Sequence, residues 1–277
     1  MASVTEIVNQ TKQPRGGYIP VKLFAKQCFD NDCALNEKEN IKPMYVGLVV
    51  DYLTRLMLTG NLFDSFEISI LGAYFKNTFA SEELVKIDRE KGFDIETLLN
   101  CIKGLDDASI VAACKIVTYD SWYRNGFGYL RPDQMWPNKQ TCENIRIMVQ
   151  RSVNFLEKHK DEINVGFIFE ERNEFGQTIH NGYTEKIHSG DGDFLTKDCI
   201  WDFKVSKNEL TTKNSLQLGM YYLMGKHSGI ELFKEVDKIG IYNPRLNCAY
   251  VLDVKDVHES VWQTIEHDII GYNETIY

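Results

Sequence analysis

Residues 189–222 decide the interpretation of this chain and read SGDGDFLTKDCIWDFKVSKNELTTKNSLQLGMYY. Apolar and polar residues alternate over 190–195 and again over 199–205, which predicts two β-strands joined by a short polar turn. Helical spacing follows over 214–227. The segment therefore predicts a β-hairpin followed by a helix, and a run of strands closed by a helix is typical of a mixed α/β or α+β fold.

Charged side chains converge on one face of this predicted hairpin. Asp202 and Lys204 are two residues apart in the second strand, so both side chains leave the same face, and Asp193 in the first strand can lie beside Asp202. Two neighbouring carboxylates repel each other unless a cation neutralises them, and their hard oxygen atoms favour Mg²⁺ or Mn²⁺. A lysine beside such a metal can position or deprotonate an attacking water. The simpler alternative is a solvated Asp–Lys pair on an exposed hairpin.

Three motifs in this order resemble the PD-(D/E)XK nuclease superfamily, and within it the RecB-like branch. They are Gly-x-x-Asp at 190–193, Asp-x-Lys at 202–204 and Gln-x-x-x-Tyr at 217–221, whose spacing puts the last two side chains on one helix face. The resemblance implies a restriction-endonuclease-like core, in which helices flank a central mixed sheet. It also implies a role for each matching residue: Asp193 and Asp202 bind the metal together with the backbone carbonyl of Phe203, Lys204 assists the water, and Gln217 and Tyr221 hold the nucleic-acid strand or brace the site.

Four further residues are candidates for the same site. Asp51 closes a Gly-x-x-x-Asp element that resembles an early-helix element of the branch, with Asp in place of His, and it could complete the metal shell. Glu170 ends the first predicted strand, where the family often has Glu. Asp191 has the same parity as Asp193 and is an alternative ligand, although the family spacing favours Asp193. Lys207 follows the hairpin and is a candidate for binding the substrate.

Apolar residues recur mostly at helical spacing over the first 160 residues, whereas apolar and polar residues alternate afterwards. The predicted strands cover 164–170, 177–187, 190–195, 199–205, 236–242 and 248–254. We therefore expect a mainly helical region over 1–160, packed on a nuclease-like core over 161–277 and contributing Asp51 to it. The two parts are expected to form one compact unit.

The net charge of −9 argues against a protein that coats nucleic acid with a basic surface. Between Phe203 and Ile230, however, there are four lysines and a single acidic residue, a local net charge of +3. A basic strip beside a metal site is what a phosphodiester substrate requires. Binding of DNA, as a single strand or a duplex end, is therefore expected at one confined site.

The seven cysteines are scattered and contain no CxxC pair, which predicts reduced thiols in a cytoplasmic protein rather than a disulfide framework or a zinc site. The sequence lacks the cysteine pattern of the iron–sulfur members of the RecB-like branch, and it lacks a Walker A motif. Neither an iron–sulfur cluster nor a nucleotide cofactor is therefore expected. No apolar run approaches the roughly 20 residues that a membrane span needs, so no membrane partner is expected.

Together these features predict a Mg²⁺- or Mn²⁺-dependent deoxyribonuclease that hydrolyses phosphodiester bonds, and the RecB-like resemblance favours an exonuclease. The alternative is a catalytically inactive subunit that binds or regulates within a DNA-processing, phage or defence assembly, with a protein partner or a second copy of itself. A third alternative is an acidic surface that mimics nucleic acid and binds a basic partner. Metal binding separates the first hypothesis from the other two.

Overall fold

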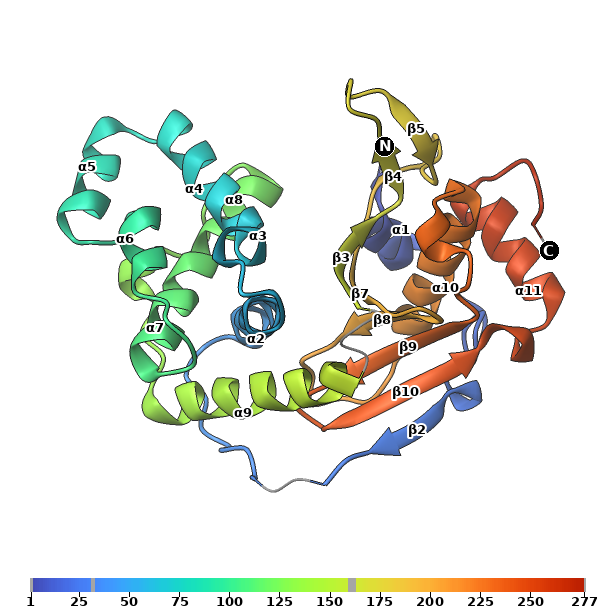
Figure 1. The fold of residues 1–277 in the computed structure, drawn as a ribbon, viewed down its shortest axis with the longest axis horizontal. Coiled ribbons are helices and arrows are strands. Elements are labelled where there is room, and N and C mark those ends of the chain that lie inside the picture. The colour runs from blue at the N-terminus through green and yellow to red at the C-terminus, as the bar shows by residue number, and fades with distance from the viewer. Residues whose placement is uncertain (1, 31–32, 159–162, 277) are drawn as a thin grey trace. The chain divides into compact units, whose positions relative to one another are not determined.

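The computed structural model describes residues 2–30, 33–158 and 163–276, and the chain divides into two compact units (Figure 1). A sheet unit comprises residues 1–29 and 159–277, and a helical unit comprises residues 30–158. The mixed α/β fold that the sequence predicts is confirmed by the mixed central sheet and the helices around it. The packing of the whole chain into one compact unit stays a prediction.

The sheet unit is built on a central sheet whose strands lie in the order β2-β10-β9-β8-β7-β3. Neighbouring strands run antiparallel, except that β8 and β9 are parallel and are connected through α10. The strands are β2 (Ala25–Cys28), β3 (Asn164–Ile168), β7 (Asp191–Leu195), β8 (Cys199–Phe203), β9 (Lys238–Asn243) and β10 (Cys248–Asp253), with two further pairs formed by β1 (Ala2–Ser3) and β6 (Ile187–Ser189) and by β4 (Glu170–Arg172) and β5 (Thr178–Asn181).

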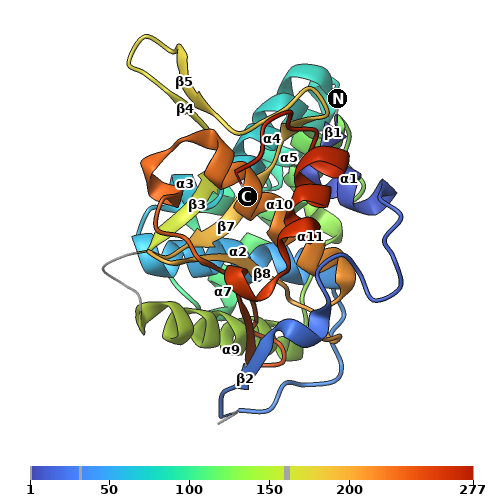
Figure 2. The same cartoon turned by 90° about the vertical axis from the view of Figure 1, so that its right-hand side faces the viewer.

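Helix α10 covers one face of the central sheet and supplies much of the core. Thr211 caps its start, because the Thr211 side chain accepts a hydrogen bond from the Asn214 N–H, and Gly229 ends it in the left-handed conformation. Buried side chains of the helix and the strands form one apolar cluster, which includes Leu216, Met220, Leu223, Leu195, Ile200, Ile239 and Ile241. The helical segments of this unit are α1 (Val4–Gln10), η1 (Val21–Leu23), α10 (Thr212–Ser228), η5 (Glu231–Phe233), η6 (Val254–Asp256), α11 (Glu259–Thr264) and the π-helix η7 (Ile265–Ile270). Helix α1 lies beside α10 (Figures 1 and 2).

The N-terminal segment belongs to the sheet unit, whereas the sequence predicted that residues 1–160 form one mainly helical region. Strand β2 extends the sheet edge by pairing with β10, and α1 buries Val4 and Val8 against the core. The physical reason is long-range strand pairing, which leaves no periodic signal in four residues of sequence. The helical unit ends at residue 158, close to the predicted end of the helical region at residue 160.

Cys28 and Cys248 form a disulfide, so the prediction that all cysteines are reduced thiols is wrong for these two. The register of β2 and β10 sets Cys28 directly opposite Cys248, with their Cα atoms 4.0 Å apart, although 220 residues separate them in the chain. The other cysteines, Cys33, Cys101, Cys114, Cys142 and Cys199, lie within the described residues and are free thiols.

Thiol counting tests this pairing. In denaturant without reductant, we expect a thiol reagent to label the five free cysteines, and after reduction it should label all seven. Labelling of seven thiols without reductant, in protein purified without reductant, would contradict the Cys28–Cys248 bond.

The helical unit is formed by α2 (Pro43–Thr59), α3 (Leu62–Ser65), α4 (Glu67–Phe79), α5 (Glu82–Glu90), α6 (Ile95–Asn100), α7 (Asp107–Ile116), η2 (Val117–Tyr119), α8 (Asp120–Asn125), η3 (Pro132–Gln134) and α9 (Lys139–Leu156). Its interior holds the buried carboxylate of Asp120, which accepts hydrogen bonds from the hydroxyls of Tyr52 and Ser69 and so links α2, α4 and α8. None of the helices in the described parts of either unit combines the length and apolar character that a membrane span requires.

Candidate active site

Strands β7 and β8 form the predicted hairpin, in which Phe194 pairs with Trp201 and Leu195 with Ile200. Asp193 and Asp202 are the next residues of the two strands beyond the Phe194–Trp201 pair. Alternate residues of a strand share a face, and Leu195 and Ile200 belong to the apolar cluster beneath α10. Both carboxylates therefore lie on the α10 side of the sheet.

Asp202 is buried, and Lys204 is its charge partner. The Asp202 side chain is 5% exposed, and the Lys204 ammonium lies 3.0 Å from its Oδ1 and 2.8 Å from its Oδ2. The Lys204 side chain itself is 33% exposed, so its head can reach solvent or a ligand. The Lys204 backbone N–H donates to the Tyr242 carbonyl at 3.1 Å, which fixes the chain just beyond the end of β8.

Asp193 points toward β8. Its Oδ2 accepts a hydrogen bond from the Phe203 N–H at 2.7 Å, so the backbone of the Asp-x-Lys segment holds this carboxylate. The Phe203 ring lies among aromatic rings, 4.4 Å from Phe194 and 5.3 Å from Tyr242 between centroids. We use the name aspartate–lysine cluster for Asp193, Asp202 and Lys204.

Gln217 and Tyr221 lie together on α10, as their spacing predicts. The Gln217 side-chain amide donates a hydrogen bond to the Tyr221 hydroxyl at 2.8 Å. The pKa of Tyr221 is raised well above its usual value, mainly because the side chain is buried and next because Asp202 is negatively charged. The charges of Asp193 and Asp191 act in the same direction. The phenol therefore stays protonated at working pH, and it lies within electrostatic reach of the aspartate–lysine cluster.

The first position of the Gly-x-x-Asp motif is a glycine, Gly190, because neighbouring side chains fill the space that a larger residue would need. A Cβ at this position would lie 2.6 Å from Val4 Cγ2 and 3.8 Å from the Tyr221 ring. The Gly190 carbonyl accepts a hydrogen bond from the Tyr183 hydroxyl at 2.7 Å. Sequence reasoning missed Val4 and Tyr183 as supports of β7, and no local pattern connects Val4 with a strand so far downstream.

Asp191 and Glu170 both lie within electrostatic reach of Tyr183. Asp191 is the exposed first residue of β7, and Glu170 begins β4 and forms an ion pair with Arg172. Burial is the main cause of the raised pKa of Tyr183, and the negative charges of Asp191 and Glu170 both add to it. Both acids therefore act electrostatically on Tyr183, which is also bonded to the start of β7.

The other two candidates, Lys207 and Asp51, belong to other segments of the chain. Lys207 is an exposed residue of the segment between β8 and α10. Asp51 belongs to the helical unit, where its Oδ1 accepts a hydrogen bond from Arg55 Nε at 2.9 Å one turn along α2. Its contribution to a metal shell stays a prediction.

The donor set of the cluster suits a small, hard cation. Among residues 2–30, 33–158 and 163–276, no group of three or more His, Cys, Asp and Glu side chains is arranged to hold a metal ion. The two carboxylates nevertheless offer oxygen ligands, and the Lys204 ammonium already places positive charge on the buried Asp202. Mg²⁺ commonly binds through one or two carboxylates and takes its other ligands from water and substrate, so Asp193 and Asp202 fit such an ion.

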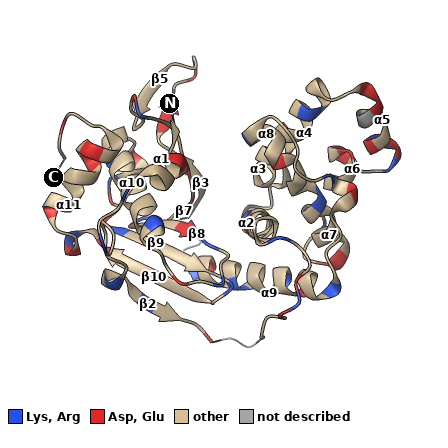
Figure 3. Cartoon of the chain, turned by 180° about the vertical axis from the view of Figure 1, so that it is seen from behind, with Lys and Arg blue, Asp and Glu red and all other residues tan. Residues whose placement is uncertain are grey.

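Basic positions are spread over several elements of both units and are not confined to the neighbourhood of the cluster (Figure 3). No protein-family model, curated protein or solved structure matches the chain. Membership of the PD-(D/E)XK superfamily therefore stays a prediction. Any functional inference for the sheet unit rests on the geometry of the aspartate–lysine cluster.

Proposed function

We propose that the sheet unit is a metal-dependent deoxyribonuclease that hydrolyses phosphodiester bonds, of the exonuclease type. The observation that carries this proposal is the placement of Asp193 and Asp202 on neighbouring strands, with Asp193 bonded to the Phe203 N–H and Lys204 bonded to the buried Asp202. Buried carboxylates with a lysine beside them suit phosphoryl chemistry, in which negative charge must be neutralised at a fixed place. The strand–strand–helix order that carries the three motifs supports assignment to a restriction-endonuclease-like core.

The residues of the site have distinct proposed roles. Asp193 and Asp202 would hold Mg²⁺ or Mn²⁺, with help from the Phe203 carbonyl, and a bound ion would neutralise phosphate charge and activate water. Lys204 reaches outward from a buried partner, so its ammonium can orient the attacking water and balance charge on the phosphate. Tyr221 remains a neutral donor, and with Gln217 it can bond to the nucleic-acid strand or brace the carboxylates.

A catalytically inactive binding or regulatory subunit is the second candidate function. One observation favours it: Lys204 already satisfies the buried charge of Asp202, so the cluster needs no metal for its stability. Calorimetric titration with Mn²⁺ separates the two functions, because the nuclease requires binding that is lost in Asp193→Asn. The protein partner or second copy, and the cytoplasmic location, stay predictions; the Cys28–Cys248 disulfide is more typical of an oxidising compartment.

The direct test is cleavage of DNA by the whole chain. Linear duplex, circular duplex and single-stranded DNA are incubated with Mg²⁺ or Mn²⁺, and we expect cleavage that stops when the metal is removed with EDTA. An exonuclease should degrade linear substrates and spare closed circles. If none of the three substrates is cleaved with either metal, while the circular dichroism spectrum shows folded protein, the proposed activity is wrong.

A further inference from the structure

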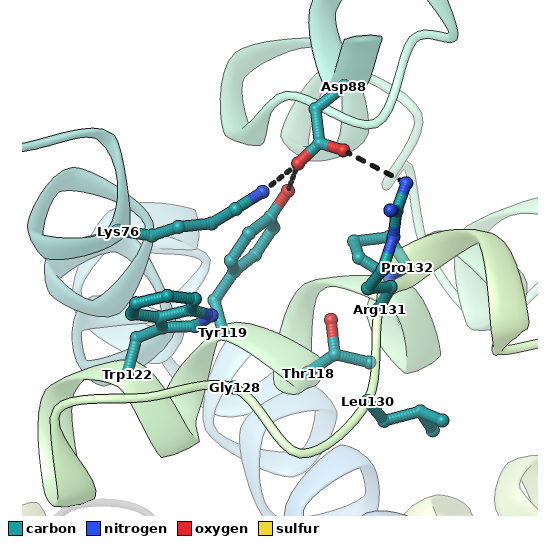
Figure 4. Close-up of a pocket in the computed structure, with 9 residues that line it drawn as sticks. All are labelled: Lys76, Asp88, Thr118, Tyr119, Trp122, Gly128, Leu130, Arg131 and Pro132. Carbon is teal, nitrogen blue, oxygen red and sulfur yellow. Dashed lines mark hydrogen bonds and ion pairs between the residues drawn. The ribbon is translucent and has the colours of Figure 1, made fainter. Parts of the chain in front are cut away.

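A pocket of about 220 Å³ lies within the helical unit, bounded by α4, α5, η2, α8 and the loop that follows α8 (Figure 4). A cavity of about 150 Å³ is known to hold benzene, and pockets for drug-sized ligands begin at about 300 Å³. The pocket therefore has room for one aromatic ring system with a substituent. It belongs to a different unit from the aspartate–lysine cluster, so a ligand site here is independent of the proposed nuclease activity.

Charged side chains converge at one end of the pocket. In Figure 4, Lys76, Tyr119 and Arg131 all point toward Asp88. Lys76 and Asp88 are buried and form an ion pair, and the Asp88 carboxylate lies 3.3 Å from the Tyr119 hydroxyl and 4.0 Å from Arg131 Nη2. Two cations and one acid line the pocket, and Asp133 pairs with Arg131 from outside the lining, so the charge of the whole group sums to zero and an anionic group would be attracted by the exposed Arg131 guanidinium alone.

Arg131 is the lining cation that an anionic group can reach from solvent. Its side chain is 44% exposed, whereas that of Lys76 is 8% exposed. Asp133 accepts a hydrogen bond from Arg131 Nε at 3.2 Å and holds the guanidinium in place. The remaining guanidinium N–H groups can donate to a phosphate in the paired geometry that arginine prefers.

An indole ring also lines the pocket. Trp122 lines the pocket on the side of Tyr119, and the loop at Gly128 closes against it (Figure 4). A Cβ at Gly128 would lie 2.3 Å from Trp122 Nε1, so only glycine lets the loop approach the indole this closely. A nucleobase can stack on such a ring whatever its sequence, because every base has a π-face.

Asp88 can also recognise the edge of a base. Its Oδ1 is 4.0 Å from Arg131 Nη2, which is beyond hydrogen-bond distance, so this oxygen retains lone pairs for an N–H donor of a ligand. Every nucleobase has such a donor on its pairing edge, and the edge is accessible only when the base is unpaired. Just outside, Phe127 and Tyr129 are 50% and 61% exposed and lie 4.8 Å apart between centroids, as a platform for neighbouring bases.

We propose that this pocket binds one unpaired nucleotide, with the base between Trp122 and Asp88 and the phosphate on Arg131. The nucleotide is either free or part of a single strand, and both sources present the same chemistry. Binding of dCMP is measured by calorimetry, and binding of a fluorescent 12-nucleotide single strand by anisotropy. Both measurements are made in EDTA, so that no metal-dependent cleavage interferes.

The decisive variant is Arg131→Gln, which is exposed enough to leave the fold intact, and its matched control is Arg89→Gln, an exposed charge on α5 that does not line the pocket. We expect Arg131→Gln and Trp122→Leu each to weaken binding about tenfold. Arg89→Gln should bind within about twofold of wild type. If Arg131→Gln weakens binding of the strand while dCMP does not bind, the ligand is a single strand. If dCMP and the strand bind with equal affinity, the ligand is the free nucleotide. Equal binding by Arg131→Gln and Arg89→Gln, or no binding of either probe at millimolar concentration, overturns the proposal, and it does so even if the nuclease activity is established.

Discussion

We expect Asp202→Asn to lower the rate of the proposed metal-dependent DNA cleavage by a factor on the order of 10³ or more, since it would remove a ligand charge at the point where phosphate charge must be neutralised. The substitution keeps the shape of the side chain but leaves the Lys204 ammonium without its anionic partner at 2.8 Å. Lys204→Ala should lower the rate by about 10²–10³, because one charge-stabilising group is lost while the buried carboxylates remain. Initial rates on a linear duplex, at saturating Mg²⁺, give both values.

Asp198→Asn is the matched control for these variants. Asp198 lies in the turn of the same hairpin, its side chain is 46% exposed, and it pairs with Lys238 at the other end of the strands. The same chemical change there should leave the cleavage rate within about twofold of wild type. If Asp202→Asn and Asp198→Asn cleave equally well while both remain folded, the cluster is not the catalytic site, whatever nuclease activity the chain has.

Much of the candidate site could be predicted because its residues lie within one local stretch. Strand parity alone brings Asp202 and Lys204 to one face, and helical spacing alone brings Gln217 and Tyr221 together. The neighbouring positions of Asp193 and Asp202 follow once the turn between the strands is short. The proximity of these residue pairs depends only on the geometry of one strand, one helix and one hairpin, and a sequence pattern indicates that geometry directly.

Long-range pairing is what the sequence could not provide. Strand β2 pairs with β10, and Cys28 meets Cys248, through a register that no local pattern encodes. The prediction of one continuous strand over 177–187 is also wrong, and here the local sequence indicated the break. Asn181 and Gly182 form a pair that is typical of turns. In the structure, β5 ends at Asn181, whose side-chain oxygen accepts a hydrogen bond from the Tyr183 N–H and turns the chain.

Glu266→Ala should destabilise the sheet unit by about 1–3 kcal/mol, the usual cost of removing one partner of buried hydrogen bonds. The Glu266 side chain is fully buried on η7, and its Oε1 lies 2.6 Å from His227 Nε2 on α10. The same oxygen accepts a hydrogen bond from the Ile276 N–H at 3.0 Å, so it also holds the C-terminal segment. The His227 ring in turn stacks on Tyr272, with 3.6 Å between centroids, so one carboxylate fixes three parts of the unit.

Urea denaturation measures this loss, with Trp201 and Trp262 reporting on the sheet unit. Glu266→Gln should cost less than Glu266→Ala, because the amide oxygen can still accept from the Ile276 N–H and the cavity left by alanine does not form. Glu259→Ala is the control, since Glu259 is an exposed residue of the neighbouring α11 and should change the free energy of unfolding by no more than about 0.5 kcal/mol. A loss below about 1 kcal/mol for Glu266→Ala would show that η7 and α10 are held together by apolar packing, with the buried Glu266–His227 pair adding nothing beyond it.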